Sequence, residues 1–147
     1  MSSVRAEAAE EQRPQRAGAL PIDDLTNVTI EEAIRIHREL GPGLFESVYE
    51  TILAGRLESR GLRVARQVPV PLSFDGRWFE VAFRVDILVE DRLVIEIKSI
   101  ERLGKSHAKQ LLTYLRLLKQ PVGLLLNFSE ATMKDGIRRL VNDYRPE

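Results

Sequence analysis

Two neighbouring stretches within residues 81–98 alternate apolar and polar side chains, a pattern typical of β-strands with one buried face. Their odd positions are apolar: Val81, Phe83, Val85, Ile87, Val89, Leu93, Ile95 and Ile97. Joining these apolar faces across a turn at Asp91 predicts an antiparallel hairpin, because a slip of one residue would expose the whole apolar set. In this register Asp86 lies opposite Glu96 on the other face, and Lys98 follows on that same face.

Two facing carboxylates repel each other unless a positive charge lies between them. Leu88 and Val94 share the face with Asp86 and Glu96, so we expect this face to be only partly accessible to water. A divalent cation fits such a place, because Mg²⁺ binds through one or two carboxylates and keeps waters and substrate phosphates as its other ligands. Lys98 would then orient a water or neutralise charge that develops on a phosphate.

The alternative is an ion-pair ladder on a solvated face, in which Arg84 and Lys98 neutralise Asp86 and Glu96 directly. The two interpretations differ in the position of the Lys98 ammonium group. In the ladder this group is paired with Glu96, whereas in the metal site an ion lies between the carboxylates. Strand alternation alone leaves both interpretations open.

Composition excludes several kinds of site. The chain of 147 residues has no cysteine, so disulfides, thiolate catalysis and cysteine-ligated metal centres are excluded, and any metal must be held by oxygen or histidine. The formal net charge is zero, which is unlike the strongly basic composition of many nucleic-acid-binding domains. No apolar run approaches the roughly 18–20 residues of a membrane span, and the N-terminus lacks the apolar centre of a signal peptide, so we expect a cytoplasmic location and no membrane partner.

The rest of the chain predicts helices on either side of a sheet. Residues 1–24 lack periodic apolar positions, so we expect a disordered tail there and a single domain over residues 25–147. Helical spacing of apolar residues predicts helices over residues 29–40, 44–60, 105–118 and 129–141. Strand patterns, with a turn at residues 75–76, predict strands over residues 64–70, 78–90, 93–100 and 121–128. The expected fold class is α/β, a mixed β-sheet flanked by helices.

A polar stripe on the third predicted helix is a candidate to join the carboxylates. His107, Gln110 and Tyr114 share one helical face, which either points at the carboxylates or lies at the surface with the tyrosine hydroxyl in water. Glu46 begins the second predicted helix, where a single glutamate is ordinarily a partner of the helix dipole. His37 is expected to be a packed or surface histidine, because no second histidine stands near it at metal-ligand spacing.

Three motifs in this order closely resemble the bacterial GxxExxY proteins, which are grouped with the PD-(D/E)xK nuclease-like superfamily. They are GPGLFESVYE, RVDILVEDRLVIEIKSI, and HAKQLLTYLRL followed by GLLLNF. The family name corresponds to Gly43, Glu46 and Tyr49 here, and the resemblance covers about residues 27–143. It implies a restriction-endonuclease-like core.

The resemblance also implies roles for individual residues. Asp86, Glu96 and Lys98 take the Asp, Glu and Lys positions of the superfamily signature, and Val85 stands where the signature has a proline that the chemistry does not require. The implied metal ligands are the side chains of Glu46, Asp86 and Glu96 and the main-chain carbonyl of Ile97, with Mg²⁺ or Mn²⁺ as cofactor. The implied catalytic residues are Asp86, Glu96, Lys98, Gln110 and Tyr114, of which the last two match a downstream glutamine and tyrosine found in a subset of the superfamily.

The leading hypothesis is therefore a Mg²⁺- or Mn²⁺-dependent phosphodiesterase that acts on nucleic acid, with DNA expected before RNA. Positive charge for the phosphate backbone would come from Arg84, Lys105, His107 and Lys109. Small nucleases of this type often act as homodimers or within larger complexes, which is the expectation for partners. The alternative is a non-catalytic module of the same fold that binds nucleic acid or protein, because fold alone does not decide function.

Overall fold

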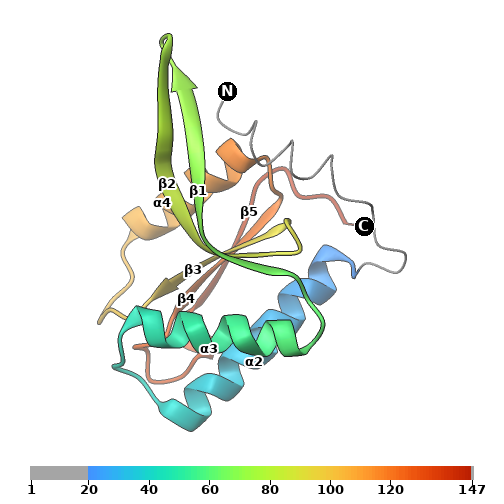
Figure 1. Cartoon of the computed structure of the whole chain (residues 1–147). Coiled ribbons are helices and arrows are strands. Elements are labelled where there is room, and N and C mark those ends of the chain that lie inside the picture. Colours follow the sequence, from blue (N-terminus) through green and yellow to red (C-terminus); the bar gives the residue numbers. More distant parts are fainter. Residues whose placement is uncertain (1–19, 147) are drawn as a thin grey trace.

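The computed structural model describes residues 20–146 and contains a five-stranded mixed sheet with helices on both faces (Figure 1). Its elements are α2 (Ile22–Leu40), α3 (Glu46–Ser59), β1 (Val64–Phe74), β2 (Arg77–Val89), β3 (Leu93–Lys98), α4 (Lys105–Leu118), β4 (Val122–Asn127), the 3₁₀ turn η1 (Lys134–Gly136) and β5 (Ile137–Val141). The strands lie in the order β1-β2-β3-β4-β5, and β3 and β4 are parallel because α4 crosses between them. The expected α/β class, a mixed sheet flanked by helices, is confirmed.

Two apolar clusters fill the space between the sheet and its helices. On one face α2 and α3 contribute residues such as Ile36 and Leu53, which pack with Ile95 of β3. On the other face Leu115 of α4 packs with Val94 of β3. Because β3 and β4 are covered on both faces, their sequences are nearly continuous apolar runs. Within residues 20–146, no helix combines the length and the apolar character that crossing a bilayer requires.

The predicted register of the β2–β3 hairpin is confirmed. Ile87 pairs with Ile95, as the joining of the two apolar faces requires. The regular pairing ends at Ile87, so Asp86 and Glu96 lie where the two strands begin to separate.

The apolar positions of β2 do not share one face, contrary to the prediction. Ile87 packs with the cluster under α2 and α3, whereas Phe83 and Val85 pack with the cluster under α4. The change occurs at Asp86, opposite Gln67 of β1, whose φ of 49° is left-handed. The left-handed residue interrupts the pleat of β1, and the side chains of β2 change face at the position beside it.

The first helix is longer than predicted. It begins at Ile22, so residues 22–24, which we expected in the tail, belong to α2. Ile22 and Leu25 are buried and extend the apolar stripe of the helix towards its N-terminus. Residues 1–19 of the predicted tail lie outside the described residues, and residues 20 and 21 directly precede α2.

The helix predicted over residues 129–141 is wrong. The chain instead forms η1 and then β5, in which Ile137 pairs with Leu126 of β4 in antiparallel fashion. Gly136 makes this return possible, because a Cβ atom there would lie 2.1 Å from the carbonyl oxygen of Asn127. Pairing with the edge of the sheet therefore overrides the helical spacing in this short segment.

The outer part of the β1–β2 hairpin, residues 72–82, projects beyond the rest of the sheet and is called the arm below (Figure 1). The predicted turn at its tip is confirmed, with φ of 51° at Asp75 and 69° at Gly76, as in the turns that suit tight hairpins. The register shifts between Val70 and Leu72, which marks an irregularity at the foot of the arm.

Candidate functional site

Asp86 and Glu96 meet in the gap where β2 and β3 separate. The main-chain N–H of Ile97 donates a hydrogen bond to Oδ2 of Asp86 at 2.8 Å, and the main-chain N–H of Asp86 donates to Oε1 of Glu96 at 3.3 Å. Each carboxylate thus binds the backbone of the opposite strand beyond the end of the regular ladder. These bonds fix both side chains at one place between the strands.

Glu96 is buried, with 6% of its surface exposed. The pKa of its carboxyl group is raised to about 8, first by burial and then by the Asp86 carboxylate, while the hydrogen bond from the Asp86 N–H and the Lys98 ammonium partly oppose this rise. Without another cation, Glu96 therefore holds a proton at neutral pH. A bound cation would replace this proton and supply the charge that the pair lacks.

The chemistry of the donors suits a hard divalent cation. Both side chains offer oxygen, and two carboxylates are the number through which Mg²⁺ commonly binds while it keeps waters in its remaining positions. In the described part of the chain, no three His, Asp or Glu side chains are grouped so as to hold one ion. The residues therefore fit a cation that retains several waters or substrate oxygens, and not a fully enclosed ion.

Lys98 ends β3 next to this pair. Its carbonyl accepts the N–H of Phe128 at 2.9 Å, and it pairs with Asn127 of β4, so its backbone is fixed by the parallel ladder. Within residues 20–146, neither Lys98 nor Arg84 forms an ion pair with Asp86 or Glu96. The ion-pair ladder is thus not formed, although the Lys98 charge acts on Glu96 from a longer distance.

The polar stripe of α4 is divided between two places. The Tyr114 ring stacks on Phe83 of β2, with centroids 3.9 Å apart and 3° between the planes. Burial raises the pKa of Tyr114, the Glu96 and Asp86 carboxylates raise it further, and the Gln110 side chain lowers it through a hydrogen bond. Tyr114 therefore borders the carboxylate pair, and Gln110 contacts the Tyr114 hydroxyl.

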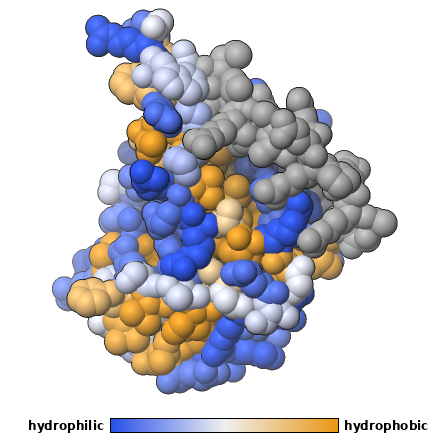
Figure 2. Space-filling model, in the orientation of Figure 1, coloured by the Kyte–Doolittle hydropathy of each residue, from blue (hydrophilic) through white to orange (hydrophobic). Residues whose placement is uncertain are grey.

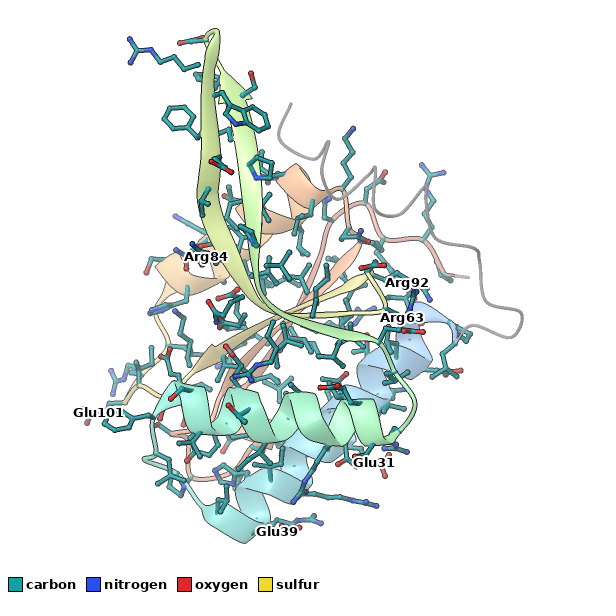
Figure 3. The ribbon with its side chains drawn as sticks, in the orientation of Figure 1. Glu31, Glu39, Arg63, Arg84, Arg92 and Glu101 are labelled. Atoms are coloured by element: carbon teal, nitrogen blue, oxygen red, sulfur yellow. The ribbon has the colours of Figure 1, made fainter. Side chains whose placement is uncertain are left out.

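His107 caps the start of α4, because its Nδ1 accepts the N–H of Gly104 at 3.0 Å. Lys105 and Lys109 are exposed on the same helix. Arg84 is also exposed and extends from β2 at the foot of the arm (Figure 3). The residues predicted to contact phosphates thus lie on α4 and β2.

Glu46 lies at the end of β3 and outside the carboxylate pair. It is exposed at the start of α3, where its Oε1 accepts the N–H of Ser99 at 3.4 Å. The Ser99 hydroxyl donates in turn to the carbonyl of Leu44 at 2.5 Å. These bonds attach the beginning of α3 to the residue that follows Lys98.

The tyrosine and glycines of the first motif shape the loop that leads to α3. Tyr49 is fully buried, and its hydroxyl donates to the carbonyl of Gly41 at 2.6 Å and accepts the N–H of Leu44 at 3.1 Å. Its ring stacks on Phe128, with centroids 4.3 Å apart. Gly43 has a φ of 95°, which strongly favours glycine. The motif therefore positions the helix that carries Glu46.

Sequence reasoning missed Gln67 and Glu50. The side-chain amide of Gln67 donates to Oδ1 of Asp86 at 3.1 Å and to Oε1 of Glu50 at 2.7 Å. Glu50 is buried, and its other oxygen binds Arg66 at 2.8 Å. One amide thus links the Asp86 carboxylate to an ion pair between buried Glu50 and exposed Arg66, and the left-handed backbone of Gln67 allows it to do so.

Asn127 was also missed, whereas His37 was predicted correctly. Asn127 is fully buried, accepts the N–H of Ile100 at 3.1 Å and donates to its carbonyl at 2.9 Å, which fixes the segment after Lys98. His37 is a packed histidine whose Nε2 binds the carbonyl of Glu130 at 2.8 Å.

Comparison with known proteins adds one firm match. A family model described as the PD-(D/E)XK nuclease superfamily matches residues 23–140, a range that includes every candidate residue named above. No protein of curated function matches the chain in sequence. A solved structure titled "Crystal structure of SSO0001" is similar with a TM-score of 0.42 and 17% identity, over 96% of this chain and 75% of that one.

Proposed function

The chain belongs to the PD-(D/E)XK nuclease superfamily, and from this premise we propose that it is a nuclease that hydrolyses phosphodiester bonds in DNA with Mg²⁺ or Mn²⁺. The observation that carries the proposal is the meeting of Asp86 and Glu96 in one gap between β2 and β3. Within the superfamily we assign the chain to the GxxExxY proteins, on the motif formed by Gly43, Glu46 and Tyr49.

Asp86 and Glu96 would hold the cation, together with the main-chain carbonyl of Ile97. A bound divalent cation lowers the pKa of a water ligand and neutralises charge that develops on the phosphate. Glu46 would bind a water of the cation's hydration shell, since the acidic side chains of residues 20–146 do not form a three-member cluster. Gln67 would keep the Asp86 carboxylate in its orientation.

Lys98, Gln110 and Tyr114 would act on the attacking water and the phosphate. The ammonium group of Lys98 is near the carboxylates without being paired to them, so it can position the water for attack. The Tyr114 hydroxyl can donate a hydrogen bond to a phosphate oxygen, and burial raises its pKa farther above neutral pH. Arg84, Lys105 and Lys109, with the second nitrogen of His107, would contact the backbone phosphates.

Labelled single-stranded DNA, duplex DNA and RNA, incubated with Mg²⁺, with Mn²⁺ or with EDTA, test the proposal. We expect cleavage that requires the cation and falls at least about 100-fold in Asp86→Asn and in Lys98→Ala. Lys134→Ala, an exposed cation on η1, is the matched control and should keep full activity. Cleavage that survives Asp86→Asn would overturn the proposed site.

The same experiment separates catalysis from binding. Gel-shift measurements on the same substrates show whether the protein binds them. Binding without cleavage under every cation, unchanged by Asp86→Asn, would overturn the nuclease proposal and identify a non-catalytic binding module. Circular dichroism of each variant excludes loss of folding as the cause.

A further inference from the structure

The arm exposes a group of large apolar side chains. The exposed fractions are 65% for Phe74, 58% for Trp78, 47% for Phe79 and 44% for Val81. Figure 2 shows hydrophobic and hydrophilic side chains alternating along this projection. Single exposed apolar residues are ordinary, but several together on a projecting hairpin mark a surface that binds something.

One face of the arm leads to the candidate site. Beyond the register shift, Leu72 and Phe74 of β1 lie on one face of the arm, and Phe79 of β2 shares that face. Val70 pairs with Phe83, whose ring stacks on Tyr114 beside the carboxylates, and farther out Leu72 pairs with Phe79. Apolar and aromatic side chains therefore follow β1 and β2, here called the ribbon, from the tip of the arm to the Tyr114 ring.

Positive charge lies beside this ribbon, on α4. The helix carries Lys105, Lys109 and Arg116, all exposed, and it has no acidic residue. On the arm itself, Arg77 is outnumbered by two acidic side chains. The arm thus offers flat apolar surfaces, and α4 offers the charge that complements a polyanion.

We propose that the arm binds unpaired bases of a nucleic acid, which stack on Phe74 and Phe79 of this face and on Trp78, paired with Ser73 on the opposite face, while the phosphates follow α4 towards Asp86. This inference rests on the proposed function and narrows its substrate to nucleic acid with a single-stranded segment. Stacking requires bases with open faces, and in a duplex neighbouring base pairs cover those faces. Trp78 is eight residues from Asp86 along β2, or roughly 25 Å in extended chain, so the single strand extends several nucleotides from the bond that is cut.

The area of the patch disfavours a second copy of the chain as the occupant. With roughly 150–250 Å² for each aromatic side chain, the exposed fractions amount to on the order of 400 Å². A stable interface buries about 800 Å² on each partner. Stacked bases need no such contiguous area, because each ring binds one base.

Trp78 is the single tryptophan of the chain, so its fluorescence reports directly on the arm. The full chain is titrated in EDTA, where no strand is cut, with a single-stranded oligonucleotide and with a blunt duplex of the same sequence. We expect saturable quenching by the single strand only. The Phe74→Ala/Phe79→Ala variant should bind the single strand roughly 10-fold more weakly in this titration, and in gel shifts it should bind the duplex as wild type does. Val141→Ala, with a similarly exposed side chain on β5, is the matched control.

Three results would overturn the inference. They are a Trp78 signal that the single strand does not change, quenching by the duplex equal to that by the single strand, and sedimentation that shows a dimer lost in Phe74→Ala/Phe79→Ala. The proposed function fails separately. Cation-dependent cleavage without a change in Trp78 fluorescence would support the nuclease and contradict the role of the arm. Quenching by single strands without cleavage under any cation would support the role of the arm and contradict the nuclease.

Discussion

Replacing Glu96 with glutamine is expected to stabilise the cation-free protein at neutral and alkaline pH. The folded protein raises the pKa of Glu96 from 4.5 to about 8, because the carboxyl group is buried and lies beside Asp86. Between these two pH values the folded state binds more protons than the unfolded state, so the free energy of unfolding falls as pH rises. Below pH 4.5 both states are protonated, and the penalty is absent.

The size of the effect follows from the shift. One pKa unit corresponds to about 1.4 kcal/mol, so the penalty at neutral pH is about 3 kcal/mol, and it continues to grow until the folded carboxyl group ionises near pH 8. Glutamine keeps an oxygen that can accept the N–H of Asp86, and it does not ionise. The variant should therefore lose the pH dependence that Glu96 causes.

Urea unfolding in EDTA, between about pH 5 and about pH 8, measures this difference. We expect the stability of Glu96→Gln relative to wild type to rise by about 3 kcal/mol across this range. Glu58→Gln, at an exposed position of α3, is the control and should run parallel to wild type. Parallel curves for wild type and Glu96→Gln would refute the reasoning, because they would mean that Glu96 ionises normally in the folded protein.

Two further predictions concern residues that support the site. Gln67→Ala removes both amide hydrogen bonds, to Asp86 and to Glu50, so it should lower the free energy of unfolding, measured in urea, by about 2 kcal/mol. It should also weaken Mn²⁺ binding measured by calorimetry, and unchanged Mn²⁺ affinity would contradict the role of Gln67 in orienting Asp86. Tyr49→Phe keeps the ring stack but leaves the carbonyl of Gly41 without the tyrosine hydroxyl, so urea unfolding should show a loss of about 1–2 kcal/mol, and a neutral effect would contradict the role assigned to that hydroxyl.

The register of the β2–β3 hairpin could be predicted because it follows from a strict physical constraint. A strand alternates its side chains between two faces, so matching the apolar positions leaves one pairing, in which Ile87 lies opposite Ile95. The same pairing brought Asp86 and Glu96 together without knowledge of the tertiary fold. The mistake about the face of Val85 arose because alternation assumes an unbroken pleat, whereas β2 changes face at Asp86, beside the left-handed Gln67 of β1.

The link through Gln67 and Glu50 could not be predicted from one sequence. The two residues belong to β1 and α3, and only the packing of that helix against the sheet brings them within hydrogen-bond distance. Nothing in the local sequence indicates that Gln67 adopts a positive φ, since glutamine has no preference for that region. The prediction of a helix in place of β5 was wrong for a related reason. The five residues of β5 fit either helical or strand periodicity, and pairing with the edge of β4 decided which one formed.

The central claim is that Asp86 and Glu96 share one divalent cation. Anomalous diffraction from a crystal soaked in Mn²⁺ tests it directly. The account predicts a peak about 2 Å from an oxygen of each carboxylate, lost in Asp86→Asn. An empty gap in a soaked crystal, with the Lys98 ammonium group bound to Glu96, would contradict it.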